Sequence, residues 1–102
     1  MKANKELIEE AIENVQDELD EEWTPIKILS RNRLKVKYSD WSGASEDVVT
    51  RDDVNNFALN WGSGIATLGN ISGDWREIQE IANDCFEVFK MIDEEITRLE
   101  AK

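Results

Sequence analysis

The chain has 102 residues, of which 40% are hydrophobic and 34% charged, and its net charge at pH 7 is −11. This length predicts a single domain over residues 1–102, with enough apolar residues for one modest core. The sequence has no histidine and one cysteine, Cys85, which excludes an internal disulfide and histidine-based catalysis and leaves too few ligands for a zinc site. We therefore expect a protein that is not an enzyme and needs no cofactor.

The sequence shows no run of about 20 apolar residues, the length that spans a bilayer. The first six residues are not followed by the apolar segment of a signal peptide. We expect a cytoplasmic protein, in the host cytoplasm if a phage encodes it, without membrane contact.

Residues 4–22 follow the periodicity of an amphipathic helix. The apolar positions at helical spacing are Leu7, Ile8, Ala11, Ile12, Val15 and Leu19. The acids step by three or four, which aligns them on one ridge: Glu6, Glu10, Glu13, Asp17 and Asp20. Pro25 ends the helix, because it pushes the preceding residue into an extended conformation.

Residues 26–39 show the alternation of a half-buried β-hairpin. Its apolar residues are Ile26, Ile28 and Leu29 in the first strand and Leu34, Val36 and Tyr38 in the second. The turn is expected at residues 30–33, where Asn32 tolerates the left-handed conformation. The remaining side chains form a basic hairpin surface made of Lys27, Arg31, Arg33, Lys35 and Lys37.

Residues 39–49 are rich in serine, glycine and acids and are expected to form a loop, with Val48 and Val49 as a short third strand if one is present. Asp40 and Trp41 lie in this loop. A loop tryptophan suits an interface anchor, or it folds back on the hairpin, and both interpretations stay open.

A second helix is expected after Thr50, which is a suitable N-cap for a first turn that carries Asp52 and Asp53. Apolar residues follow at helical spacing in Val54, Phe57, Ala58 and Trp61. The helix ends near Gly62 or continues with a kink to about residue 69, where Gly69-Asn70 is a stop signal.

Residues 73–100 predict a long final helix capped by Ser72, and the expected fold class is therefore α+β, in the order helix, two- or three-stranded antiparallel sheet, helix, long helix. Two heptad-spaced series form its apolar stripe: Trp75, Ala82, Phe89, Ile96 and Ile78, Cys85, Ile92, Leu99. The stripe is narrow in the second half, which predicts an oligomer seam of Ile92, Ile96 and Leu99. A second acidic ridge comprises Glu77, Glu80, Asp84, Glu87 and Glu94.

Charge is strongly segregated along the chain. Residues 1–22 carry nine acids and two lysines, and residues 73–102 carry nine acids and four basic residues, whereas residues 23–72 have a net charge of +1. Each ridge places a charge about every 5 Å along its helix, and two such helices side by side would approach the charge density of duplex DNA. Solvation alone explains many charged helix faces, and this explanation also stays open.

The first functional hypothesis is a binding inhibitor that presents the acidic ridges to a basic nucleic-acid-binding protein or nuclease complex as a nucleic-acid mimic. In size, acidity and lack of catalytic residues the chain resembles the inhibitors that phages and mobile elements direct against host defences, anti-CRISPR proteins among them. No motif carries this resemblance, and no residue is assigned from it.

The alternative hypothesis is an assembly protein that forms a homodimer or docks on a partner through its last helix. A small enzyme is the third hypothesis, and it would need a carboxylate cluster in a pocket. Direct nucleic-acid binding by the basic hairpin surface is disfavoured, because the net charge repels a polyanion.

Overall fold

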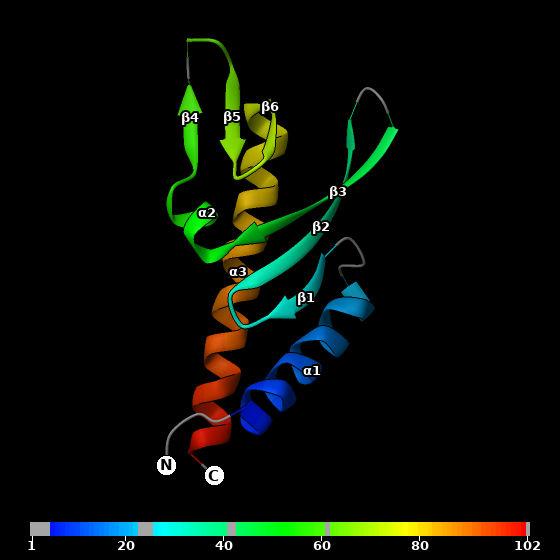
Figure 1. The fold of residues 1–102 in the computed structure, drawn as a ribbon, viewed down its shortest axis with the longest axis vertical. Coiled ribbons are helices and arrows are strands. Elements are labelled where there is room, and N and C mark those ends of the chain that lie inside the picture. The colour runs from blue at the N-terminus through cyan, green and yellow to red at the C-terminus, as the bar shows by residue number, and fades with distance from the viewer. Residues whose placement is uncertain (1–4, 23–25, 41–42, 61, 102) are drawn as a thin grey trace.

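The computed structural model describes residues 5–22, 26–40, 43–60 and 62–101 and shows a mixed α+β fold (Figure 1). The elements in chain order are α1 (Lys5–Glu22), β1 (Ile26–Ser30), β2 (Arg33–Asp40), β3 (Gly43–Thr50), α2 (Arg51–Asn55), β4 (Ala58–Asn60), β5 (Ile65–Leu68), β6 (Ile71–Asp74) and α3 (Trp75–Glu100). The predicted α+β class, first helix, hairpin and long last helix are confirmed.

The first sheet has the order β1-β2-β3 and is antiparallel throughout. Its strands alternate as predicted, and the inward side chains of Ile26, Ile28, Leu34, Val36 and Val49 are buried. The expectation of a loop at residues 39–49 is wrong over the described residues. Gly43–Thr50 forms a full third strand, paired with β2 along its whole length, because polar cross-strand pairs stabilise it on a solvated arm.

Helix α1 packs against β1 and the C-terminal half of α3 through its apolar stripe, in which Ala11, Val15 and Leu19 are buried. Its Gln16 covers the outer edge of the first sheet. The Gln16 side chain accepts a hydrogen bond from the Ile28 N–H at 2.6 Å and donates one to the Ile26 carbonyl at 3.3 Å. These two bonds satisfy backbone groups that an edge strand leaves without a partner strand.

The predicted second helix is wrong beyond its first turn. Thr50 is the N-cap, and its capping box with Asp53 is formed, but α2 ends at Asn55 and a second antiparallel sheet follows, in the order β4-β5-β6. Gly69 adopts a positive φ of 59° in the turn that joins β5 to β6. Gly69-Asn70 is therefore a hairpin turn and not a helix stop.

Helix α3 begins after Asp74, whose side chain accepts from the Arg76 N–H, so the predicted cap at Ser72 is wrong by two residues. The predicted heptad stripe is buried except for Trp75, which is partly exposed. The second half of the stripe is not a free seam. Ile92, Ile96 and Leu99 are buried within the same core cluster as the α1 stripe, because α1 occupies the position predicted for a partner helix.

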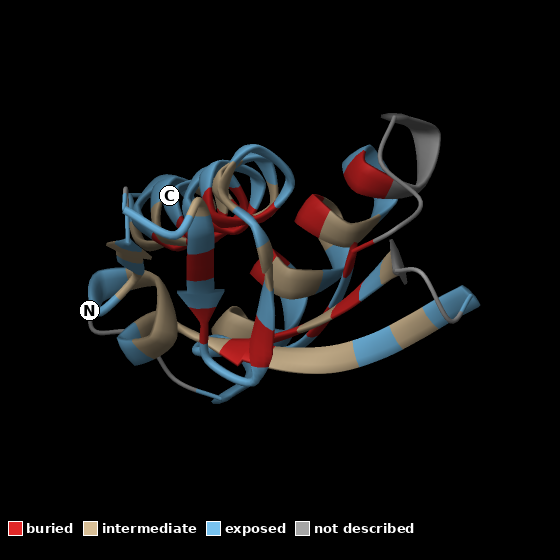
Figure 2. Ribbon diagram, turned by 90° about the horizontal axis from the view of Figure 1, so that it is seen from above, coloured by how far each residue is buried: buried red, intermediate tan, exposed pale blue. Residues whose placement is uncertain are grey.

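The molecule has two layers, with α1 and α3 on one side of the first sheet (Figure 2). The second sheet lies beside the N-terminal half of α3 (Figure 1). All buried hydrophobic residues among those described belong to one cluster. The molecule is elongated, 48 × 24 × 18 Å, because the 26 residues of α3 extend for about 39 Å. None of the described helices combines the length and the apolarity that a membrane-spanning helix needs.

Candidate partner-binding site

Two groups of carboxylates cover the helical layer. On α1, the acids lie opposite the buried stripe and are exposed: Glu6, Glu10, Glu13 and Asp17. On α3, the exposed acids are Glu77, Glu80, Asp84, Glu87 and Glu94. These nine residues are called the acidic helix surface below. The side chain of Asp20 lies outside the described residues.

The acidic helix surface is not neutralised by the rest of the molecule. None of its nine carboxylates forms a salt bridge with a residue that the structure describes. Glu10 is near enough to Arg98 to help raise the pKa of that guanidinium, after the larger effect of the Arg98–Glu95 hydrogen bond. The negative charge of the acidic helix surface is therefore available to an external cation.

The predicted basic hairpin surface lies on the first sheet, and much of its charge is already paired. Lys27, Arg33 and Lys37 are exposed. Lys35 and Lys37 both pair with Glu46, at 3.4 and 3.8 Å, and Arg31 lies 4.0 Å from Asp93 of α3. The intramolecular pairs reduce the charge that this surface offers to an anionic partner.

The predicted loop anchor is only partly placed. Asp40 is the last residue of β2, opposite Gly43 in the register with β3, at the end of the sheet arm that extends away from α3 (Figure 1). Trp41 and the side chain of Asp40 lie outside the described residues.

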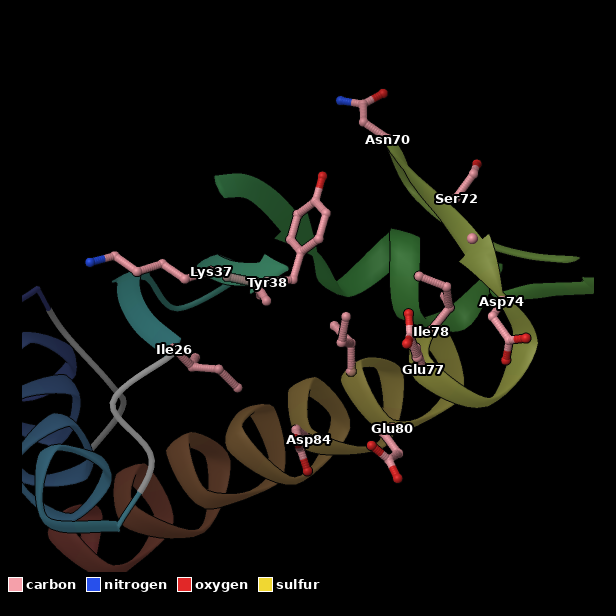
Figure 3. Close-up of a pocket in the computed structure, with 13 residues that line it drawn as sticks. Ile26, Lys37, Tyr38, Asn70, Ser72, Asp74, Glu77, Ile78, Glu80 and Asp84 are labelled. Atoms are coloured by element: carbon pink, nitrogen blue, oxygen red, sulfur yellow. The ribbon is translucent and has the colours of Figure 1, made fainter. Parts of the chain in front are cut away.

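A cleft of about 910 Å³ opens between the N-terminal half of α3, the first sheet and β6 (Figure 3). Ile26, Val36, Ile78 and Ile81 line it with apolar atoms. Three members of the acidic helix surface, Glu77, Glu80 and Asp84, contribute from α3, and Asp74 adds a fourth carboxylate at the end of β6. The volume falls within the range of pockets that bind organic ligands and side chains.

The charges around the cleft have one dominant sign. Tyr38 stands on the wall opposite α3, whereas the ammonium group of Lys37 extends away from the carboxylates (Figure 3). The pKa of Asp84 is raised, first by its partial burial and then by repulsion from Glu80. A cation placed between these two carboxylates would counteract both effects, because an opposite charge favours the ionised form.

The sequence indicates part of this site and misses the rest. It predicts the carboxylates of α3 and the inward face of β2, but it does not predict β6, because the pattern of residues 65–74 predicts helix or loop. Ala66 and Leu68 are buried in alternation with Ile65 and Thr67 in β5, but the sequence does not show this alternation because the exposed Ile65 is itself apolar.

Within the described residues, no group of three or more potential ligands could hold a metal ion. The thiol of Cys85 is buried, and its pKa is raised to about 12, mainly by this burial and also by the charge of Asp84. A buried thiol with a raised pKa is a poor nucleophile in this conformation.

No protein-family model, curated protein or solved structure matches this chain.

Proposed function

We propose that this protein is a non-enzymatic inhibitor whose acidic helix surface occupies the basic, nucleic-acid-binding surface of a protein partner. The observation that carries the proposal is the contrast between the two charged surfaces. The nine exposed carboxylates have no salt bridge among the described residues, whereas three of the five hairpin cations are paired within the chain.

Uncompensated charge on ordered helices is a source of electrostatic complementarity. It costs a little stability, because carboxylates at i and i+4, such as Glu6 and Glu10, repel each other by about 0.2–0.5 kcal/mol per pair. It also accelerates association with a basic partner and repels anionic ones. An anionic surface with regularly spaced charges on two helices can compete with the phosphates of a nucleic acid for the basic groups of the partner.

The other hypotheses receive less support. Assembly through Ile92, Ile96 and Leu99 would require α1 to leave α3, because these side chains are buried inside the chain. A carboxylate enzyme would use Glu77, Glu80 or Asp84, which border the cleft, and the pKa of Asp84 is raised. All three residues are nevertheless classed as exposed. Water screens such groups and weakens the pKa separation that acid–base catalysis needs.

The test begins with the immobilised full chain and a lysate of the cells that encode it. Partners identified by mass spectrometry are then purified, and their affinity for duplex DNA or RNA is measured with and without the protein. We expect the protein to abolish nucleic-acid binding by its partner at 0.15 M salt and to lose this effect near 0.5 M, where charge is more strongly screened.

Two matched variants locate the responsible surface. The Glu6→Gln/Glu13→Gln/Asp17→Asn variant removes three charges from α1 and should inhibit less. The Lys27→Gln/Lys35→Gln/Lys37→Gln variant removes three charges of the opposite sign from the first sheet and should inhibit at least as well as the native protein. A partner whose nucleic-acid binding is unchanged at saturating protein, or inhibition that resists salt, contradicts the proposal.

A further inference from the structure

The wall of the cleft formed by β6 is the edge of a sheet. Ser72, Gly73 and Asp74 are consecutive, and all three line the cleft. Side chains of successive strand residues point to opposite faces, so three consecutive lining residues mean that the backbone edge itself borders the cleft. The strand order β4-β5-β6 places β6 at the end of its sheet.

This edge has no partner in the described part of the chain. None of the described backbone–backbone hydrogen bonds outside the helices and sheets involves residues 71–74. At Asp74 the strand passes into α3, where the Asp74 side chain accepts from the Arg76 N–H. The corresponding edge of β1 is covered by Gln16. Leu68 and Ile71 flank the two-residue turn and pair with each other. The next residue, Ser72, therefore directs its N–H and carbonyl away from β5.

The local chemistry suits the approach of another backbone. Gly73 has no side chain at the centre of the exposed edge, and glycine within a strand commonly marks a place where a second chain comes close. Ile26, Val36 and Ile81 supply apolar contacts across the cleft. An extended peptide that added to β6 would thus bury apolar side chains as well as pair its backbone.

Charge selects among the molecules that could fill the cleft. The carboxylates of Glu77, Glu80 and Asp84 repel nucleic acids and other anions, and the described residues offer no cluster of metal ligands. Arginine is the favoured counterpart, because its guanidinium is weakly hydrated, stays charged and bonds carboxylates through two N–H groups.

We infer that the cleft receives an extended, arginine-containing segment of a protein partner, which adds as a strand to the edge of β6 and places basic side chains against Glu77, Glu80 and Asp84. This inference deepens the proposed function, on which it rests for the existence of a basic protein partner. It assigns the principal contact to the cleft and to backbone pairing, in addition to the surface charge of the helices.

The test uses the full chain and a fluorescein-labelled eight-residue peptide of alternating arginine and valine, with affinity measured by fluorescence anisotropy at 0.15 M salt. Two further peptides carry N-methyl groups on every arginine amide or on every valine amide. Each methylation blocks hydrogen bonding along one edge of the extended peptide. At least one of the two should bind at least about tenfold more weakly, a loss equivalent to 1.4 kcal/mol.

Charge-matched variants separate the cleft from general acidity. Glu77→Gln/Glu80→Gln/Asp84→Asn removes three charges at the cleft, and Glu6→Gln/Glu13→Gln/Asp17→Asn removes three from the far side of α1. All six residues are exposed, so both variants should fold, as circular dichroism can verify. We expect the first to weaken peptide binding at least about tenfold and the second less than about threefold.

The position of the peptide is read from amide resonances of ¹⁵N-labelled protein. The amides of Ser72 and Gly73 should shift on binding, and that of Ser72 should become protected from hydrogen exchange.

Equal weakening by both variants, or unchanged binding of both methylated peptides, overturns the inference. If the cleft variant still inhibits the native partner while the α1 variant does not, the proposed function stands and the cleft inference fails. Full inhibition of the native partner by the cleft variant and by the α1 variant contradicts both the proposed function and the cleft inference.

Discussion

Arg51 and Asp93 lie 42 positions apart in the sequence and are joined by two parallel hydrogen bonds, of 2.9 Å from Nη1 to Oδ2 and 2.7 Å from Nη2 to Oδ1. The guanidinium of Arg51 also stacks 4.8 Å from the ring centroid of Phe89 and donates through Nε to the Arg31 carbonyl. Arg51 therefore holds the first turn of α2, the β1–β2 turn and the middle of α3 together. It is placed by the capping box at Thr50, which fixes the first turn of α2.

Replacement of Arg51 should destabilise the protein more than replacement of any exposed hairpin cation. The pair with Asp93 is partly exposed, which limits its contribution to about 1 kcal/mol or less, and the stacking on Phe89 contributes about 0.5–1 kcal/mol. Arg51→Ala should thus lower the free energy of unfolding by about 1–2 kcal/mol in urea titrations. Arg33→Ala, at an exposed position on β2, should change it by less than about 0.5 kcal/mol. Equal effects of the two substitutions would disprove this role.

A side chain at Gly69 should destabilise the turn between β5 and β6. Its φ of 59° is unfavourable for other residues, and a Cβ there would lie 2.7 Å from Oδ2 of Asp53, within the capping box of α2. Gly69→Ala should therefore lower the midpoint of thermal unfolding by roughly 4–16 °C, equivalent to about 1–2 kcal/mol. Gly62→Ala is the control, because its φ is not in the left-handed region and its Cβ would make only a 3.4 Å contact. A Gly69 variant as stable as the control would contradict the prediction.

The elements that the sequence predicts well are those whose period persists over many residues. The first helix, the 26–39 hairpin and the last helix each repeat their apolar pattern for several turns or strand residues, and packing only reinforces it. The sequence does not predict the second sheet, because the helical spacing of Val54 in α2 continues by chance through Phe57 to Ala58 in β4. The strands of this sheet have only three or four residues, too few for a clear period of their own. Burial of Ala66 and Leu68 against α3 is a tertiary effect that decides between helix and strand there.

Of the candidate site, the sequence predicts the exposed acids but not the cleft. Exposure of the acids on α1 and α3 follows from helical phase alone, since each lies away from the buried stripe. The cleft depends on how two sheets meet one helix, and one of its walls is a strand that local pattern does not reveal. The sequence also does not predict which helix covers Ile92, Ile96 and Leu99, because a narrow apolar stripe fits a helix of the same chain as well as one from a second copy.

Cys85 should be almost unreactive in the folded protein. Its side chain is fully buried, and burial together with Asp84 raises its pKa to about 12, so thiolate is scarce at pH 8. Alkylation by iodoacetamide should be at least about a thousandfold slower in the native protein than in urea, where the thiol regains a pKa near 8.5. In a Cys85→Ala/Glu87→Cys variant the exposed thiol should react quickly without urea. Rapid native labelling of Cys85, within about tenfold of the unfolded rate, would show that the site opens readily.

The raised pKa of Asp84 makes a signed prediction about stability and pH. Partial burial and the charge of Glu80 hold protons on this carboxyl in the folded state to a higher pH than in the unfolded chain. The folded state therefore binds more protons between the unfolded pKa, about 3.9, and the raised folded pKa. The contribution of Asp84 to stability is fully present below that window, declines as pH rises through it, and is lowest at pH 7.

Asp84→Asn should accordingly stabilise the protein at pH 7 and have little effect at pH 3. Removal of the i, i+4 repulsion with Glu80 is worth about 0.2–0.5 kcal/mol, or a rise of about 1–4 °C in the midpoint of thermal unfolding. Glu94→Gln is the matched control, because Glu94 lies four residues from both Lys90 and Arg98, and its neutralisation should lower stability at pH 7. A gain for Asp84→Asn that is as large at pH 3 as at pH 7 would mean that the carboxylate charge is not its cause.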